Sequence, residues 1–188
     1  LVTEFFFFFD SRPETRKISL NWLLKQAKWS LNQTTIRVMP YQKPAIDLNQ
    51  LMIKNHNFHH NHTFRVYGLV NQQPFKIFAD LLNSDDVLRA HSWSGRLYGK
   101  LPMLSWHHWL NKIDVLAIDM ADISAEAWLE LQAGSLQAVS AKLNVQQLIG
   151  TLAEPSQPIE VQNFTATVAW QQQKQSWRAS IQQAQGML

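Results

Sequence analysis

The chain has 188 residues, of which 46% are hydrophobic and only 16% are charged. Its net charge of +3 is small and the sequence shows no basic stripe, which argues against a nucleic-acid-binding function. The absence of cysteine excludes disulfides, thiolate metal sites and cysteine catalysis. No apolar run approaches the ~18–20 residues that a membrane span needs.

The N-terminal part of the chain predicts strands joined by polar turns. The apolar run Phe5–Phe9 suits a strand that is covered on both faces or lies against lipid. Ile18–Gln26 predicts a short helix or the entry to a strand. Lys28–Met39 alternates between two faces and predicts a strand. One face of that strand is expected to carry Trp29, Leu31, Gln33, Thr35, Arg37 and Met39.

The next segments continue the alternation. Ala45–Phe58 predicts a strand with a phase slip near Gln50 that marks a β-bulge. Asn55–Asn61 is expected to be a polar turn rich in histidine. Asn71–Pro74 predicts a hairpin break, and alternating segments lie on both sides of it.

The stretch 93–110 is the most distinctive part of the sequence. Ser92–Leu101 predicts a strand that ends at Pro102. After it, the spacing of three and four residues predicts a short helix over Met103–Leu110. Met103, Trp106, Trp109 and Leu110 would share one face of that helix. No nucleophile or pair of carboxylates accompanies this stretch, so it favours a scaffold for apolar ligands over a catalyst.

The second half of the chain is a series of hairpins. It predicts strands over Val115–Met120, Ile123–Leu131, Val139–Val145, Ile159–Trp170 and Trp177–Ala184. The whole chain therefore predicts about ten strands. Because no βαβ period of ~30 residues appears, the strands are expected to form an antiparallel meander.

Candidate metal and acid–base residues have a simpler interpretation. Histidine is a ligand for Zn²⁺ and Ni²⁺, but His56, His59, His60 and His62 are interpreted as parts of a solvated turn. His107 and His108 are interpreted as the polar side of the predicted helix. Asp85 and Asp86 are assigned to a loop. Asp114, Asp119 and Asp122 are assigned to turns and surface positions. The sequence predicts no metal, no cofactor and no enzyme activity.

Aromatic residues leave two interpretations open. They either pack in an ordinary core or contact acyl chains on the concave side of a curved sheet. The residues concerned are Trp29, Phe64, Phe75, Trp93, Trp106, Trp109, Trp128, Trp170 and Trp177. Strand alternation places Leu129 and Leu131 on the face opposite Trp128.

Several motifs, taken in order, resemble a known family. They are Trp22-Leu23-Leu24-Lys25-Gln26, the strand Trp29–Val38, His62-x-Phe64-x-Val66, Trp93–Tyr98, Trp106 and Trp109, Ala127–Leu131, Gly134-Ser135-Leu136 with Val139, Val168-Ala169-Trp170, and Ser176-Trp177. Over residues 18–188, their order and spacing resemble the central region of YhdP-type proteins of the AsmA-like superfamily of Gram-negative bacteria.

The resemblance implies a segment of a bridge-like lipid-transfer protein. Such a protein forms a long, curved periplasmic β-groove with an apolar inner face for acyl chains. It is anchored in the inner membrane by an N-terminal helix outside these residues, moves phospholipid toward the outer membrane and supports the outer-membrane barrier. The implied partners are phospholipid acyl chains, adjoining groove segments of the same chain, and a membrane reached through other parts of the protein.

The combined expectation is a mainly β fold. Residues 1–188 would form one segment of a larger curved antiparallel meander sheet, or β-groove, with one or two short helices. The Met103–Leu110 helix would cap or line this groove. The alternative is a structural or protein-interaction β-sandwich of the cell envelope that binds no lipid. The residues expected to contact lipid are Val66, Ile77, Leu97, Leu129, Leu131, Val139, Ala141 and Leu143.

Overall fold

In the residues that it describes, the computed structural model contains ten strands in one sheet. It describes residues 4–6, 22, 24–38, 45–83, 92–106, 116–152, 156–173 and 176–187. The strands are β1 (Glu4–Phe6), β2 (Lys28–Val38), β3 (Ile46–Phe58), β4 (Asn61–Val70), β5 (Gln73–Asn83), β6 (Trp93–Ser105), β7 (Leu116–Gln132), β8 (Ser135–Leu152), β9 (Gln157–Gln173) and β10 (Ser176–Met187).

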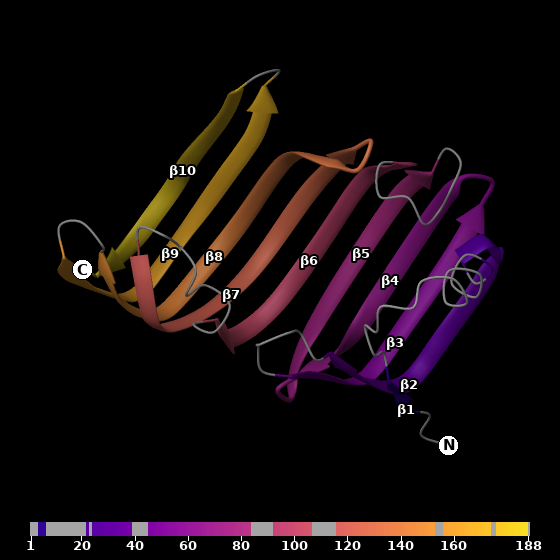
Figure 1. Ribbon diagram of the computed structural model, residues 1–188, viewed down its shortest axis with the longest axis horizontal. Coiled ribbons are helices and arrows are strands. Elements are labelled where there is room, and N and C mark those ends of the chain that lie inside the picture. The colour runs from indigo at the N-terminus through magenta and orange to yellow at the C-terminus, as the bar shows by residue number, and fades with distance from the viewer. Residues whose placement is uncertain are drawn as a thin grey trace.

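The strands follow one another across the sheet in chain order (Figure 1). Strands β2 to β10 pair antiparallel with their neighbours, as the meander prediction requires. Only the three residues of β1 pair parallel, with β2. Because every described strand belongs to this single sheet, the described residues do not form a sandwich.

Tight turns fix the register of two central hairpins. Asn71 and Gln72 both have positive φ, at 50° and 62°, as do Ala133 and Gly134, at 49° and 72°. Two consecutive residues with positive φ form a type I′ turn, whose twist matches that of the strands it joins. The first turn lies at the predicted hairpin break Asn71–Pro74, and the second lies between the predicted strands Ile123–Leu131 and Val139–Val145.

A line of irregularities crosses the sheet near one end of the strands. The pairing register shifts after Leu31 in β2, near Gln50 in β3, after Leu101 in β6, near Asp119 and Asp122 in β7 and after Gln182 in β10. One further shift, between Glu130 and Leu131, lies toward the other end of β7. Bulges bend a strand and increase its twist. Figure 1 accordingly shows a broad wall of strands that turn sharply near their lower ends. The bulge that the sequence predicts near Gln50 is confirmed, with Gln50 at φ 49°.

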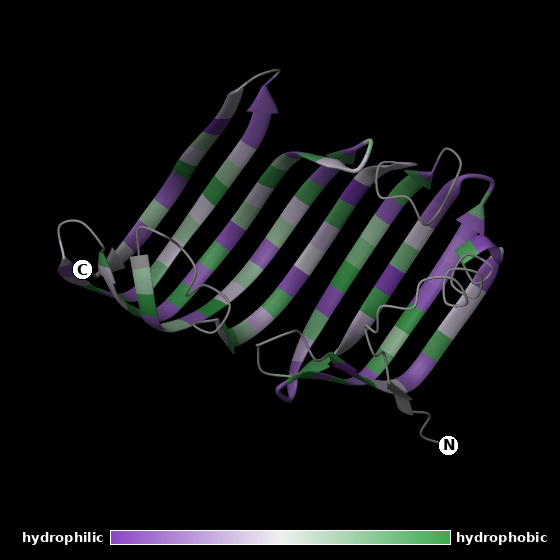
Figure 2. Ribbon diagram, viewed as in Figure 1, coloured by the Kyte–Doolittle hydropathy of each residue, from purple (hydrophilic) through white to green (hydrophobic). Residues whose placement is uncertain are grey.

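The bend encloses one face of the sheet, here called the inner face. Leu51, Val70 and Phe75 are buried there and form a cluster. Ile36, Ile46, Leu48, Ile53, Val66, Ile77, Leu101 and Leu104 pack against it. Residues from both sides of the bulges thus contact one cluster, which shows that the sheet is concave on this side. The opposite side is called the outer face. Figure 2 shows the resulting alternation of apolar and polar bands along the strands.

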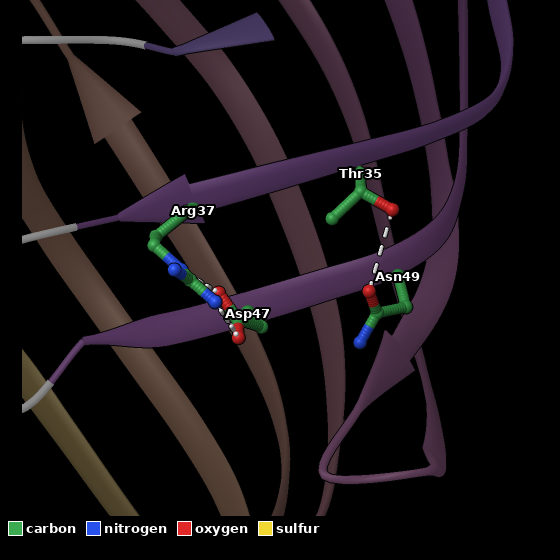
Figure 3. A network of polar contacts seen from close by, with 4 residues as sticks. All are labelled: Thr35, Arg37, Asp47 and Asn49. Carbon is green, nitrogen blue, oxygen red and sulfur yellow. Dashed lines mark hydrogen bonds and ion pairs between the residues drawn. The ribbon is translucent and has the colours of Figure 1, made fainter. Parts of the chain in front are cut away.

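The bulge at Gln33 changes which residues of β2 share a face. Trp29 and Leu31 lie on the inner face, but beyond Gln33 the inner positions are Thr34 and Ile36. Thr35 and Arg37 lie on the outer face, where Figure 3 shows them bonded to Asn49 and Asp47 of β3. The prediction that Thr35 and Arg37 share a face with Trp29 is therefore wrong. It assumed strict alternation through a residue whose φ is 52°.

The predicted helix over Met103–Leu110 is also wrong at its start. Strand β6 continues through Pro102, Met103 and Leu104 to Ser105. Pro102 is accommodated because it lies at a register shift between Leu101 and Leu104, where the ladder lacks a regular pair. Trp109 and Leu110 lie outside the described residues, as do His107 and His108.

Two other boundaries differ from the predictions. Residues 55–58 belong to β3, so the predicted polar turn Asn55–Asn61 shrinks to His59 and His60. The two strands predicted over Val115–Met120 and Ile123–Leu131 form one long strand, β7, with bulges inside it. α-Helical structure in the described ranges is confined to Trp22, Leu24 and Lys25, within the predicted segment Ile18–Gln26. None of the described helical structure has the length and apolar character of a membrane span.

Candidate functional site

The inner face carries a continuous apolar row across the whole width of the meander. Its nine members are directly paired from strand to strand. They are Leu31, Ile53, Val66, Ile77, Gly99, Ala127, Ala141, Val168 and Ile181. Eight steps of about 4.8 Å between strands give this row a length of roughly 38 Å. Its direction is perpendicular to the strands and parallel to the line of bulges.

Small residues form the floor of this row over the middle strands. Gly99, Ala127 and Ala141 are adjacent in β6, β7 and β8. A Cβ atom added at Gly99 would meet nothing within 4 Å, so the space above this glycine is open. Larger side chains flank it on the next row, where Leu97, Leu129 and Val139 are paired. The inner face therefore has a shallow apolar lane between taller side chains.

The structure brings all eight sequence-predicted lipid-contacting residues to this face. Val66 pairs with Ile77, and Leu97 pairs with Leu129, which pairs with Val139. Leu131, Ala141 and Leu143 lie at alternate positions of the same strands. Apart from glycine, the other described inner-face residues of β2 to β9 are mostly apolar and none carries a charge. Such a surface can contact hydrocarbon without burying an ionised group.

One polar group interrupts the apolar inner face near the β3–β4 hairpin. Asn55 is 1% exposed and His62 is 2% exposed. Five buried polar atoms here have no hydrogen-bond partner among the residues that the structure describes. They are both amide atoms of Asn55, the Nδ1 of His62, the Oδ1 of Asn57 and the Nε1 of Trp29. Register pairs Trp29 with Asn55 and Asn57 with His62, so these side chains are neighbours. We call these four residues the inner polar group.

His62 is held among aromatic rings. Its ring centroid lies 6.0 Å from that of Phe64 and 5.0 Å from that of Trp93. Burial, with a smaller contribution from the charge of His60, lowers the pKa of His62. The side chain is therefore neutral at pH 7, which is consistent with a face that carries no other ionisable group in the described ranges. The sequence reasoning missed this group because it placed Asn55 in a turn.

The predicted cap residues are only partly brought together. Met103 and Leu104 lie in β6, and Leu104 packs against the Leu51 cluster. Trp106 follows the strand and is anchored on β7. Its backbone N–H donates to the Ala121 carbonyl at 2.7 Å, and its indole Nε1 donates to the Ile123 carbonyl at 2.9 Å. Trp106 thus joins the end of β6 to the bulged part of β7.

The other aromatic residues divide between the two faces. Trp29, Phe64, Phe75, Trp93 and Trp170 lie on the inner face. Trp128 lies on the outer face, opposite to Leu129 and Leu131 as predicted. There it continues a cross-strand series of rings through Tyr98 and Phe78 to Tyr67, with centroids 5.3–5.7 Å apart. Contacts of this kind stabilise neighbouring strands of a sheet.

The outer face is polar and bears ion pairs. Arg37 donates two hydrogen bonds to Asp47 at 2.6 and 2.8 Å, and this contact lowers the pKa of Asp47. Arg96 pairs with Glu130 at 3.3 Å. The Tyr98 hydroxyl donates to Glu126 at 2.7 Å, which raises the pKa of Tyr98.

The histidines of the predicted turn are separated by the strand geometry. His56 lies on the outer face in register with Lys28, and His62 lies on the inner face. His59 and His60 form the turn between them. No group of three or more His, Cys, Asp or Glu side chains in the described part of the chain is placed to hold a metal ion. Asp119 and Asp122 lie in β7, while Asp85, Asp86 and Asp114 lie outside the described residues.

Comparison with known families gives one result. The family model described as "YhdP protein" matches residues 7–185, which is nearly the whole chain. No curated protein and no solved structure matches the chain.

Proposed function

The chain belongs to the YhdP protein family, and from this premise we propose that it is a non-enzymatic segment of a lipid-conducting groove. Membership indicates a cell-envelope protein related to lipid transport. We propose more narrowly that acyl chains of phospholipids lie on the inner face during transfer between the inner and outer membranes. Transfer of this kind would support the outer-membrane barrier.

The uninterrupted apolar row from Leu31 to Ile181 is the observation that supports this proposal most directly. A row of paired side chains perpendicular to the strands offers hydrocarbon a path that crosses many strands. A large apolar face on a single sheet needs a cover, and a lipid chain is a suitable one. The small residues at Gly99, Ala127 and Ala141 leave room for that chain.

Location and neighbours follow from the same proposal. The segment would lie in the periplasm, held to the inner membrane through a part of the protein outside these residues. Among the described strands, β10 pairs only with β9, and its Ile181 continues the apolar row to the edge of the sheet. We propose that an adjoining groove segment pairs with this edge and extends the lane.

A substitution at Gly99 tests the proposal without relying on loss of folding. Gly99→Phe adds a ring to an open space, and an aromatic residue is favoured over glycine in a strand. The melting temperature should therefore not fall. Binding of a phospholipid with a fluorescent label on its acyl chain should weaken about tenfold, because the ring occupies the lane.

The matched control places the same ring on the other face. Ser140 is exposed on the outer face of β8, opposite Trp128. Ser140→Phe should leave binding of the labelled phospholipid unchanged. If both variants bind as the unmodified chain does, or if the unmodified chain binds no phospholipid, the inner face is not the lipid site.

A further inference from the structure

The outer face of β2, β3 and β4 carries a concentration of basic side chains. Two adjacent rows cross these strands in direct register, Lys28–His56–Thr63 and Ser30–Lys54–Arg65. We call Lys28, Lys54, His56 and Arg65 the basic cluster. No acidic residue lies in either row on these three strands. The whole chain has 17 basic and 14 acidic residues, which give a net charge of +3. Lys28, Lys54 and Arg65 thus place as many positive charges in this small area as the net charge of the entire chain.

The basic cluster lacks the carboxylate partners that Arg37 and Arg96 have elsewhere on the outer face. Lys54 and Arg65 are directly opposite, an arrangement of like charges that destabilises a sheet. Lys28, Lys54 and Arg65 make no ion pair with any residue in the described ranges. By contrast, Arg96 and Arg37 both pair with carboxylates. An external anion is the partner that would relieve the repulsion between Lys54 and Arg65.

The shape and chemistry of the area suit phosphate groups. The basic cluster lines an open hollow of about 640 Å³ together with Ser30 and Thr63. Lysine and arginine form charge-assisted hydrogen bonds with phosphate oxygens. The Ser30 hydroxyl adds a further donor, whereas the Thr63 hydroxyl already donates to Asp80 of β5 at 2.9 Å. The cations come from three strands over two rows, so they match a surface that presents several anions rather than a single small ion.

An exposed apolar side chain adjoins the basic cluster at the β3–β4 hairpin end. Phe58 is 68% exposed and lies two residues beyond His56 on the same face of β3. Basic residues beside exposed aromatic residues are typical of surfaces that bind membranes.

We infer that this end of the outer face docks on the surface of an anionic phospholipid bilayer. Lys28, Lys54 and Arg65 contact lipid phosphates, and Phe58 enters the headgroup region. This contact is separate from the acyl-chain lane, which lies on the opposite face of the sheet. It adds a membrane contact within these residues to the anchor proposed outside them.

Vesicle co-sedimentation with the 188-residue chain tests the inference. The unmodified chain should bind vesicles of phosphatidylcholine containing phosphatidylglycerol and should not bind vesicles of phosphatidylcholine alone. Lys54→Gln/Arg65→Gln should weaken binding about 25-fold, at about fivefold for each basic residue. This variant should fold, because it removes two opposed like charges.

The matched control removes the same charge elsewhere on the outer face. Lys100 and Lys142 both lie beside Glu126 in the row of β6, β7 and β8. Lys100→Gln/Lys142→Gln should change vesicle binding by less than about twofold. Equal losses in the two double variants would show an effect of net charge alone and would overturn the inference.

A second variant separates a bilayer from an acidic protein as the partner. Phe58→Ser should weaken vesicle binding severalfold while leaving the melting temperature unchanged, because Phe58 is mostly exposed. The chain could instead bind soluble polyglutamate as strongly as it binds vesicles, with no effect of Phe58→Ser on either. That result would assign the basic cluster to an acidic protein segment and would overturn the inference. The Gly99→Phe variant should bind these vesicles as the unmodified chain does, so this test is independent of the acyl-chain lane.

Discussion

Asn55 is almost completely buried, and its amide atoms have no hydrogen-bond partner among the residues that the structure describes. A buried amide without partners costs about 1–3 kcal/mol. Asn55→Leu replaces the amide with an apolar group of similar volume among apolar neighbours, so we expect the free energy of unfolding to rise by about 1–3 kcal/mol. Urea denaturation measures this change.

The control for Asn55 is an asparagine on the outer face. Asn144 is exposed in β8, and Asn144→Leu should change the free energy of unfolding by less than about 0.5 kcal/mol. A loss of stability in Asn55→Leu would mean that the Asn55 amide has a partner in solution, such as an ordered water molecule within the inner polar group.

Single residues also show what the sequence can and cannot reveal. The eight inner-face positions were predictable because alternation has a period of two. The register shift between Glu130 and Leu131 adds its extra residue to β8, so it leaves the alternation of β7 through Leu129 and Leu131 intact. The basic cluster was not predictable, because Lys28, Lys54 and Arg65 come together only through the pairing register of three strands. The inner polar group was missed for a related reason, since polar composition around Asn55 resembles a turn although the segment is a strand.

At the scale of the strand, the bulges decide the shape of the sheet. Gln50 adopts φ 49° at the register shift of β3. A left-handed conformation costs a residue with a Cβ atom about 1–2 kcal/mol, and more if it is β-branched. Gln50→Gly should therefore raise the free energy of unfolding by about 0.5–1 kcal/mol, and Gln50→Val should lower it by more than 1 kcal/mol.

The difference in the free energy of unfolding between Gln50→Gly and Gln50→Val is the quantity that tests this conformation. A thermal or urea unfolding series on both chains, with Gln50→Asn as an intermediate, should give the order Gly, Asn, Val from most to least stable. Valine more stable than glycine would show that residue 50 is not left-handed and that the bend in β3 arises elsewhere.

Strand identity was easier to predict than strand detail. The sequence indicated about ten strands and the phase slip near Gln50, because apolar residues visibly change sides there. It did not indicate the slip at Gln33, since glutamine and threonine fit either face. The predicted helix after Pro102 failed because the spacing of Met103 and Trp106 fits a helix, whereas in the structure tertiary pairing with β7 keeps residues 103–105 in a strand.

At the scale of the molecule, the described part of the chain is one open sheet with β10 at its edge. Among the described strands β10 has β9 as its only neighbour, and its Ile181 is 70% exposed. An unpaired edge with an apolar side chain promotes association between chains. We expect concentration-dependent self-association, and Ile181→Lys should weaken it at least about tenfold, because burial of isoleucine at the contact contributes ~1.5 kcal/mol or more.

Analytical ultracentrifugation measures this association. Gln182→Lys adds the same charge to the outer face of the same strand and should have a much smaller effect. If the two lysine variants associate equally, the contact does not use the inner side of the β10 edge, and the proposed extension of the lane across that edge loses its support.

The line of bulges has a consequence for how such a protein grows. Each long strand other than β4 and β5 has its own irregularity, and the β4–β5 hairpin turns at the same level. Curvature is thus encoded locally, hairpin by hairpin, and does not depend on closing the sheet into a ring. Duplication of a hairpin in evolution would lengthen the groove while preserving its cross-section. The length and the width of the groove can therefore change independently.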